Sequence, residues 1–184
     1  YKTLTHTWSV LVDKKKSSKF LFEVSWEVCN PLGSIYNSLA NKVPAIQTEY
    51  GDNYVAVGPW ITSNLKQDAH FHEEIWDSEL EERLGNGSHR VRMGRWQIPG
   101  EPKCLLIDHT HMMGSADDIL AHFWQKFKLN SLFGGSDYRS QIVFGFAAGK
   151  VLEDYLYQSL LPKGLGVAVQ AHDWMAASVI LYIC

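Results

Sequence analysis

A strand, a tight turn and a helix are predicted in immediate succession near the start of the chain. Phe20–Val28 is too apolar for a strand with one wet face, which indicates a strand buried on both faces of a parallel sheet. Asn30-Pro31 ends this strand, Gly33 allows a sharp reversal of the backbone, and Ser34 is expected to cap the helix that follows. A buried strand joined to a helix in this way requires a sheet with helices packed on its faces.

The same turn has two interpretations. Backbone N–H groups at a helix N-terminus carry partial positive charge, and a glycine before them lets a ligand approach the backbone closely. A phosphate site at Gly33 and Ser34 is therefore one interpretation. The other is an ordinary connection, because every α/β protein contains turns of this kind.

Strands and helices alternate along the rest of the chain. We expect strands at about residues 49–59, 91–96, 103–108 and 166–171, and helices at about residues 71–84, 115–127, 140–161 and 175–183. Residues 1–19 are predicted to be a polar tail or edge strand, and residues 20–184 a doubly wound α/β domain with a Rossmann-like, mainly parallel sheet. The last helix reaches Cys184 in mid pattern, so we expect the sequence to be the front part of a longer protein.

Composition excludes several classes of function. A net charge of −3 and a pI near 6.2 argue against a nucleic-acid surface or a polybasic membrane patch. Apolar runs are far shorter than the roughly 20 residues of a membrane helix, and the three cysteines show no spacing pattern, so we expect a soluble cytoplasmic protein with reduced thiols. The glycine motifs of dinucleotide and P-loop sites are absent from the sequence.

Two segments are expected at the carboxyl ends of strands, where doubly wound domains bind ligands. One is Asn30–Ser34 and the other is His172-Asp173-Trp174. A histidine at a strand end can offer a hydrogen bond or a carbonyl dipole to a polar substrate, whereas the alternative is a core or helix-capping histidine. The pairs His70/His72 and His109/His111 have the spacing of some metal ligands but no assured third ligand, and we expect no metal.

Five segments, in order, resemble the N-terminal half of the eukaryote-type glycogen synthases and their bacterial relatives. They are EVSWEVCNPLGSIYNSLANK, GDNYVAVGP, VRMGRWQIPGEP, IVFGFAAGKVLE and AHDWMAA. The resemblance implies the N-terminal lobe of a two-domain GT-B enzyme, a retaining glucosyltransferase that adds glucose to the non-reducing end of an α-1,4-glucan. It implies UDP-glucose or ADP-glucose as donor, the glucan as acceptor, and neither a metal nor another cofactor. Whether the protein is a monomer or a homo-oligomer stays open.

The resemblance also assigns roles to residues. His172 matches the family histidine that lies against the donor glucose, with Asp173 in place of glutamate and Trp174 kept. His172 is therefore the candidate catalytic residue, and Asn30, Gly33, Ser34 and Asp173 are the candidate donor-binding residues.

The chain departs from the family pattern at two places. The family's basic residue before Val-Gly-Gly is Pro31 here, which removes a charge-assisted contact commonly worth about 1.5–3 kcal/mol. The Asn-Asp before the long central helix is replaced by Arg139-Ser140. The family's two glutamates and its arginine and lysine that grip the diphosphate belong to the C-terminal lobe, so this chain alone is expected to transfer no glucose. A non-catalytic glucan- or nucleotide-sugar-binding relative is the alternative.

Overall fold

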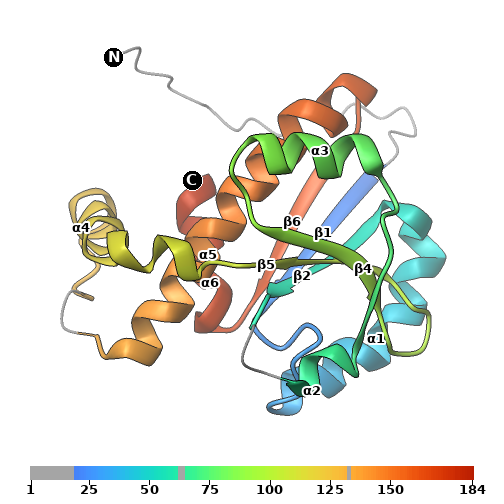
Figure 1. Ribbon diagram of the computed structural model, residues 1–184, viewed down its shortest axis with the longest axis horizontal. Coiled ribbons are helices and arrows are strands. Elements are labelled where there is room, and N and C mark those ends of the chain that lie inside the picture. Colours follow the sequence, from blue (N-terminus) through green and yellow to red (C-terminus); the bar gives the residue numbers. More distant parts are fainter. Residues whose placement is uncertain (1–18, 62–64, 132–133) are drawn as a thin grey trace.

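The fold is built on one six-stranded sheet with the strand order β3-β4-β5-β2-β1-β6. A computed structural model describes residues 19–61, 65–131 and 134–184 (Figure 1). The strands are β1 (Lys19–Ser25), β2 (Tyr54–Pro59), β3 (Phe71–Glu73), β4 (Val91–Trp96), β5 (Lys103–Ile107) and β6 (Gly166–His172). The strands β5, β2, β1 and β6 run parallel, whereas β3 and β4 add an antiparallel edge. The predicted mainly parallel α/β sheet is therefore confirmed.

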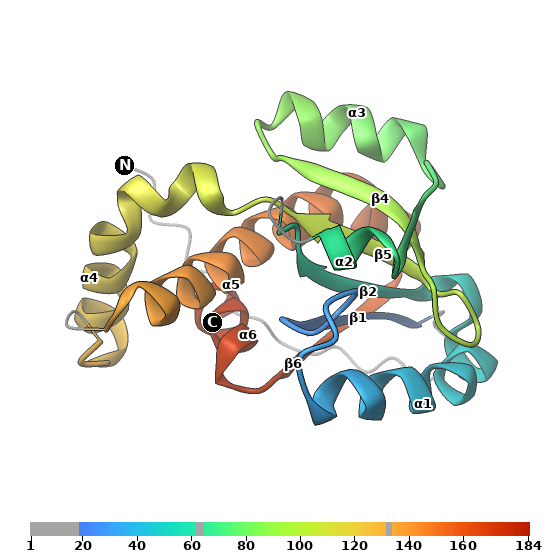
Figure 2. The ribbon, with the colours of Figure 1, turned by 60° about the horizontal axis from the view of Figure 1, so that its bottom comes forward.

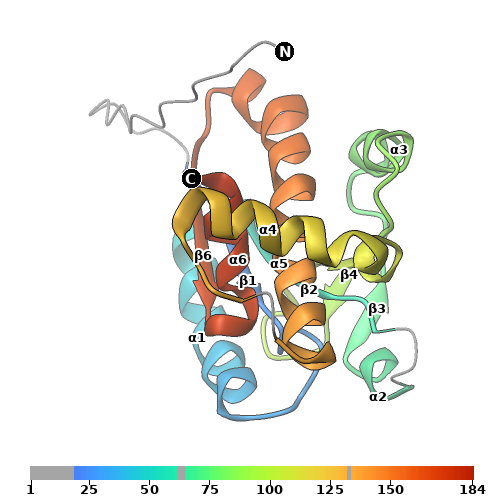
Figure 3. The same cartoon turned by 90° about the vertical axis from the view of Figure 1, so that its left-hand side faces the viewer.

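Helices cover both faces of this sheet. They are α1 (Ser34–Tyr50), α2 (Leu65–Asp68), α3 (Ser78–Asn86), α4 (Ala116–Phe127), α5 (Ser136–Tyr155) and α6 (Trp174–Ile183). Figure 2 shows α1 on one face of the sheet, with α3 and α5 on the other. Figure 3 shows α4 lying across α5, against which it buries a smaller apolar cluster. No helix within the described ranges is long and apolar enough to cross a membrane.

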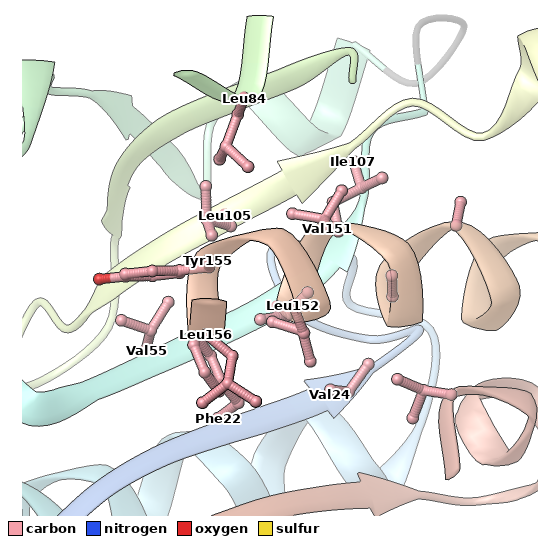
Figure 4. Close-up of a cluster of buried hydrophobic side chains, with 14 of the residues drawn as sticks. Phe22, Val24, Val55, Leu84, Leu105, Ile107, Val151, Leu152, Tyr155 and Leu156 are labelled. Atoms are coloured by element: carbon pink, nitrogen blue, oxygen red, sulfur yellow. The ribbon is translucent and has the colours of Figure 1, made fainter. Parts of the chain in front are cut away.

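Strand β1 is buried on both faces, as its sequence predicts. Phe22 and Val24 pack with Leu152 in the larger core beneath α5 (Figure 4). Leu21 points to the opposite face and packs with Leu39 of α1 in the second core. Because successive side chains of a strand alternate between faces, one apolar strand serves two cores.

Two predicted boundaries in the first half of the chain are wrong, and one strand there was not predicted. Strand β1 ends at Ser25, because the Ser25 hydroxyl accepts a hydrogen bond from the N–H of Glu27 at 3.1 Å and the chain turns there. The helix expected at 71–84 starts only at Ser78, where the Asp77 carboxylate caps it by accepting from the N–H of Leu80. The three residues at the start of that range form β3 instead, since pairing with β4 overrides their helical pattern.

The last two elements also differ from expectation. Helix α5 begins at Ser136, ahead of the predicted residue 140, and passes at Tyr155 into a π-helical turn, Leu156–Leu160. Strand β6 forms at the predicted position but extends to His172, pairs with β1 alone among the described residues, and is partly exposed. The predicted N-terminal tail lies outside the described residues, except that Lys19 begins β1.

Helices α5 and α6 approach each other closely at Gly145. A Cβ atom added at this glycine would overlap Ser178 Oγ and lie 2.9 Å from the backbone nitrogen of Val179. Ser178 is fully buried and donates its hydroxyl proton to the carbonyl of Ile142, 2.9 Å away. The glycine thus leaves room for a hydrogen bond that joins the two helices.

We expect Gly145→Ala to lower the free energy of unfolding by about 1–3 kcal/mol, because the new methyl group overpacks this contact. Gly85→Ala is the matched control, since nothing lies within 4 Å of a Cβ there and alanine favours the helix by up to about 1 kcal/mol. Urea denaturation of both variants measures the difference. Equal effects of the two substitutions would contradict the close packing.

Candidate functional site

The carboxyl ends of the parallel strands bring the predicted site segments to one edge of the sheet. Ser25, the last residue of β1, is in register with His172, the last residue of β6. The turn Trp26–Ser34 follows β1 and Asp173 follows β6, so the two segments leave neighbouring strands on the same edge. The sequence predicted that both segments follow strand ends, and the structure adds that the two strands are neighbours.

A buried carboxylate on β1, that of Glu23, contacts side chains from three neighbouring elements near this edge of the sheet. Glu23 is 0% exposed, and its Oε2 accepts a hydrogen bond from the hydroxyl of Tyr54 at 2.5 Å. Its Oε1 lies 2.7 Å from His172 Nε2 and forms an ion pair with the ammonium group of Lys42 on α1. One side chain therefore ties β1 to β2, β6 and α1.

The charge state of this cluster follows from its contacts. Burial by itself raises the pKa of Glu23, but hydrogen bonds from His172, Lys42 and Tyr54 outweigh it and hold that pKa below its usual value. Burial, and the negative charge of Glu23, raise the pKa of the Tyr54 phenol. At neutral pH the carboxylate is thus ionised and the phenol is a neutral donor.

The contact with Glu23 orients the candidate catalytic histidine. The His172 side chain is 21% exposed, and its Nε2 faces the carboxylate of Glu23, to which Nε2–H donates a hydrogen bond. Because Nε2 is engaged in this way, Nδ1 is the ring nitrogen left to contact a substrate. His172 is therefore a fixed, partly accessible group, and its catalytic role stays a prediction.

Asp173 holds a strained backbone conformation directly after this histidine. Its φ of 65° and ψ of 170° lie in a region that side chains other than glycine rarely adopt, at a cost of about 1–3 kcal/mol. Its exposed side chain accepts a hydrogen bond from the N–H of Trp174 at 2.6 Å, which caps α6. The carboxylate is thus held over the start of that helix.

The turn after β1 is held by a second buried carboxylate, Glu27. Its Oε2 accepts hydrogen bonds from the N–H groups of Gly33 at 3.0 Å and Tyr36 at 2.8 Å. The prediction that Ser34 caps α1 is wrong, because Gly33 occupies the N-cap position and Glu27 supplies the acceptor. A phosphate at this helix end would compete with Glu27 for those two N–H groups, so any donor contact must come from other atoms of the turn.

The remaining donor-binding candidates face different surroundings. Asn30 is buried and donates from Nδ2 to the carbonyl of Trp26 at 3.2 Å, so it shapes the turn. Ser34 and Pro31 are exposed. A donor-binding role for Asn30, Gly33 and Ser34 stays a prediction.

A buried histidine, His109, follows the end of β5, and the sequence indicated it only as a possible metal ligand. His109 Nε2 lies 2.9 Å from Ser140 Oγ, and its ring contacts Trp26 with 5.6 Å between centroids. Burial lowers the pKa of His109, which keeps the imidazole neutral. Ser140, one of the departures from the family pattern, therefore joins the start of α5 to the ends of β5 and β1.

The histidine pairs do not converge on a common point. His70 Nδ1 lies 3.0 Å from the hydroxyl of Tyr36, while His109 contacts Ser140 and both His72 and His111 are exposed. Among residues 19–61, 65–131 and 134–184, no group of three or more His, Cys, Asp or Glu side chains could hold a metal ion.

The thiols of Cys29 and Cys104 are buried, with 3.8 Å between the sulfur atoms, and do not form a disulfide.

Two residues of the candidate site that were not predicted, Glu23 and Glu27, could have been recognised from the sequence. Glu23 and Glu27 are the only acids in the otherwise apolar run Phe20–Val28, and a carboxylate in such a run must find partners. Lys42 left no signal, because a lysine on a predicted helix is ordinarily solvated.

The comparisons with known proteins all point to one family. The family model described as glycogen synthase matches residues 23–184. The chain is 27% identical over 158 residues to "Glycogen (starch) synthase, liver" of Homo sapiens, which covers 85% of this chain and 22% of that protein. It is 29% identical over 168 residues to "Glycogen (starch) synthase" of Neurospora crassa, covering 89% of the chain and 23% of the relative. The chain thus spans about a fifth of the length of these curated relatives.

We expect Glu23→Gln to lower the free energy of unfolding at pH 7 by about 2–3 kcal/mol, because it removes the charge on which three partners converge. The folded-state pKa of Glu23 lies below its ordinary 4.5, so its contribution is present above that value and is lost as the pH falls through the folded pKa. The wild type should therefore lose stability more steeply below about pH 4.5 than the variant does.

Glu49→Gln on the exposed side of α1 is the control, with an expected change within about 0.5 kcal/mol. Urea denaturation at several pH values between 3 and 7 provides both measurements. Identical pH profiles for the wild type and Glu23→Gln would rule out the charged state assigned to Glu23.

Proposed function

The chain belongs to the glycogen synthase family, and from this premise we propose that it forms the N-terminal lobe of a retaining glucosyltransferase. The proposed enzyme transfers glucose from UDP-glucose or ADP-glucose to the non-reducing end of an α-1,4-glucan. The observation that carries the proposal is His172, which ends β6 within the family-matched region and whose imidazole is held by buried Glu23.

Within this proposal the histidine acts in two ways. In a retaining transfer the bond from the anomeric carbon to the diphosphate loosens before the acceptor hydroxyl arrives on the same face, so positive charge develops on the sugar ring. The backbone carbonyl of His172 supplies a dipole that stabilises this charge, and a fixed dipole is more effective in a closed, dry cleft than in water. The imidazole accepts a hydrogen bond from a sugar hydroxyl through Nδ1, because Glu23 engages Nε2.

The rest of the proposed cleft belongs to a second lobe. The human relative is about four times as long as this chain, because the same alignment covers 85% of the chain and 22% of the relative. In the family the diphosphate is gripped by the lobe that the matched region does not include. Closure of that lobe over His172 would exclude water and complete the site. No metal or other cofactor is part of the proposal.

A glucan- or nucleotide-sugar-binding protein without catalytic activity is the second candidate. Pro31 lacks the charge of the family's basic residue, and Glu27 already occupies two N–H groups at the start of α1. Both features weaken the hold on a donor phosphate from this lobe. They favour binding without transfer if the second lobe does not compensate.

Glucose transfer by the natural full-length protein tests the proposal. The protein is incubated with glycogen and radiolabelled UDP-glucose or ADP-glucose, and label in the precipitated polysaccharide is counted. Incorporation with either donor supports the enzyme, and an α-linked product identifies retention. Tight glycogen binding without incorporation from either donor would instead select the second candidate.

We expect His172→Ala in the full-length protein to lower kcat by roughly 10²-fold, because the sugar loses a fixed hydrogen-bond partner. His122→Ala is the control, since His122 is exposed on α4 and its loss should leave kcat unchanged. Thermal unfolding is recorded on the same preparations. A normal kcat together with a lowered melting temperature would show that His172 is a structural residue.

A further inference from the structure

Two aromatic rings from different helices stack at the same edge of the sheet as His172. The indole of Trp174, at the start of α6, and the phenol ring of Tyr138, in the first turn of α5, lie 5.8 Å apart between centroids and only 14° from parallel. Trp174 is 48% exposed, which fits a flat ring with one face covered by its neighbour. An ordered, half-exposed aromatic surface is therefore present there.

The chain connects this pair to the candidate site on both sides. Trp174 comes two residues after His172, and Tyr138 comes two residues before Ser140, whose hydroxyl contacts His109 at the end of β5. The rings therefore lie beyond the carboxyl ends of the strands, where α/β domains bind their ligands.

We propose that the Trp174–Tyr138 pair is a subsite for one glucose unit of the α-1,4-glucan acceptor, an inference that rests on the proposed function. A pyranose ring presents a face of C–H groups, and stacking it on the exposed face of the indole removes apolar surface of both partners from water. Because Tyr138 already fixes the indole, little side-chain entropy is lost when the sugar binds.

The neighbouring carboxylate provides a hydrogen-bond acceptor for sugar hydroxyls. The carboxylate of Asp173 is exposed and is held next to the indole by its hydrogen bond from the N–H of Trp174. Carboxylate oxygens accept several hydrogen bonds, so the Asp173 carboxylate can receive hydrogen bonds from sugar hydroxyls. An aromatic face beside a fixed acceptor is the combination that a carbohydrate requires.

A second exposed tryptophan provides a matched comparison. Trp124 on α4 is 41% exposed, but its ring lies near the ammonium group of Lys128, 5.9 Å from the centroid, and not beside a strand end. It has the same chemistry and similar exposure away from the proposed subsite.

Binding of maltoheptaose to the natural full-length protein, measured by calorimetry, tests the proposal. We expect Trp174→Ala to raise the Kd for maltoheptaose about tenfold and Trp174→Phe to raise it no more than about threefold, since phenylalanine can still stack. Trp124→Ala should leave this Kd unchanged, and none of the three variants should alter the Kd for UDP. An unchanged maltoheptaose Kd in Trp174→Ala, or a weakened affinity for UDP in its place, would overturn the assignment.

A measurement on the wild-type protein covers the case in which Trp174→Ala does not fold. The indole N–H resonance of Trp174, identified in the NMR spectrum by its loss in Trp174→Phe, should shift on titration with maltoheptaose, and that of Trp124 should not. A Trp174 resonance that does not move would contradict the subsite. Glucose transfer by the wild type is measured separately. If the protein binds glucan through Trp174 but transfers no glucose, the subsite is supported and only the proposed activity is contradicted.

Discussion

A carboxylate taken out of water in the middle of a sheet must be paired, and Glu23 is paired from three directions. Tyr54, Lys42 and His172 come from the next strand on one side, from α1 and from the next strand on the other side. Removing any of these partners would leave buried charge without full compensation, which is costly in a protein interior. The positions of β2, β6 and α1 around β1 are therefore tied to one side chain as well as to apolar packing.

The same requirement shapes the edge of the sheet where the function is proposed. Glu27 fills the role that a helix-capping side chain or a bound anion would have at the start of α1. Its two hydrogen bonds fix the turn after β1, and Glu23 fixes the imidazole at the end of β6. Two buried acids, four residues apart, thus hold both segments of the candidate site in fixed positions. The protein provides an ordered surface at this edge, as tight and selective binding requires.

The departures from the family pattern gain a physical meaning in this setting. Ser140 contacts His109, so the replaced position now contributes to the packing of α5 against the strand ends. Pro31 lies exposed on the turn, beside an acid that already uses the helix N-terminus. The surface of this lobe toward a donor phosphate is therefore poor in positive charge, while the surface around Trp174 offers an aromatic ring and a carboxylate suited to a neutral sugar.

The sequence by itself determined the α/β class, the doubly buried β1 and the presence of His172 at a strand end, whereas the reversal predicted at Gly33 lies at Trp26–Cys29 and Gly33 is extended. Each depends on local patterns, because apolar runs, turn residues and helix periodicity act over a few neighbouring residues. Only the tertiary structure decided that Phe71–Glu73 is a strand, that Glu27 caps α1 and that Glu23 holds His172. These outcomes depend on pairing between segments distant in the chain, with 149 residues separating Glu23 from His172. Burial gives such contacts their strength, and burial is a property of the assembled fold.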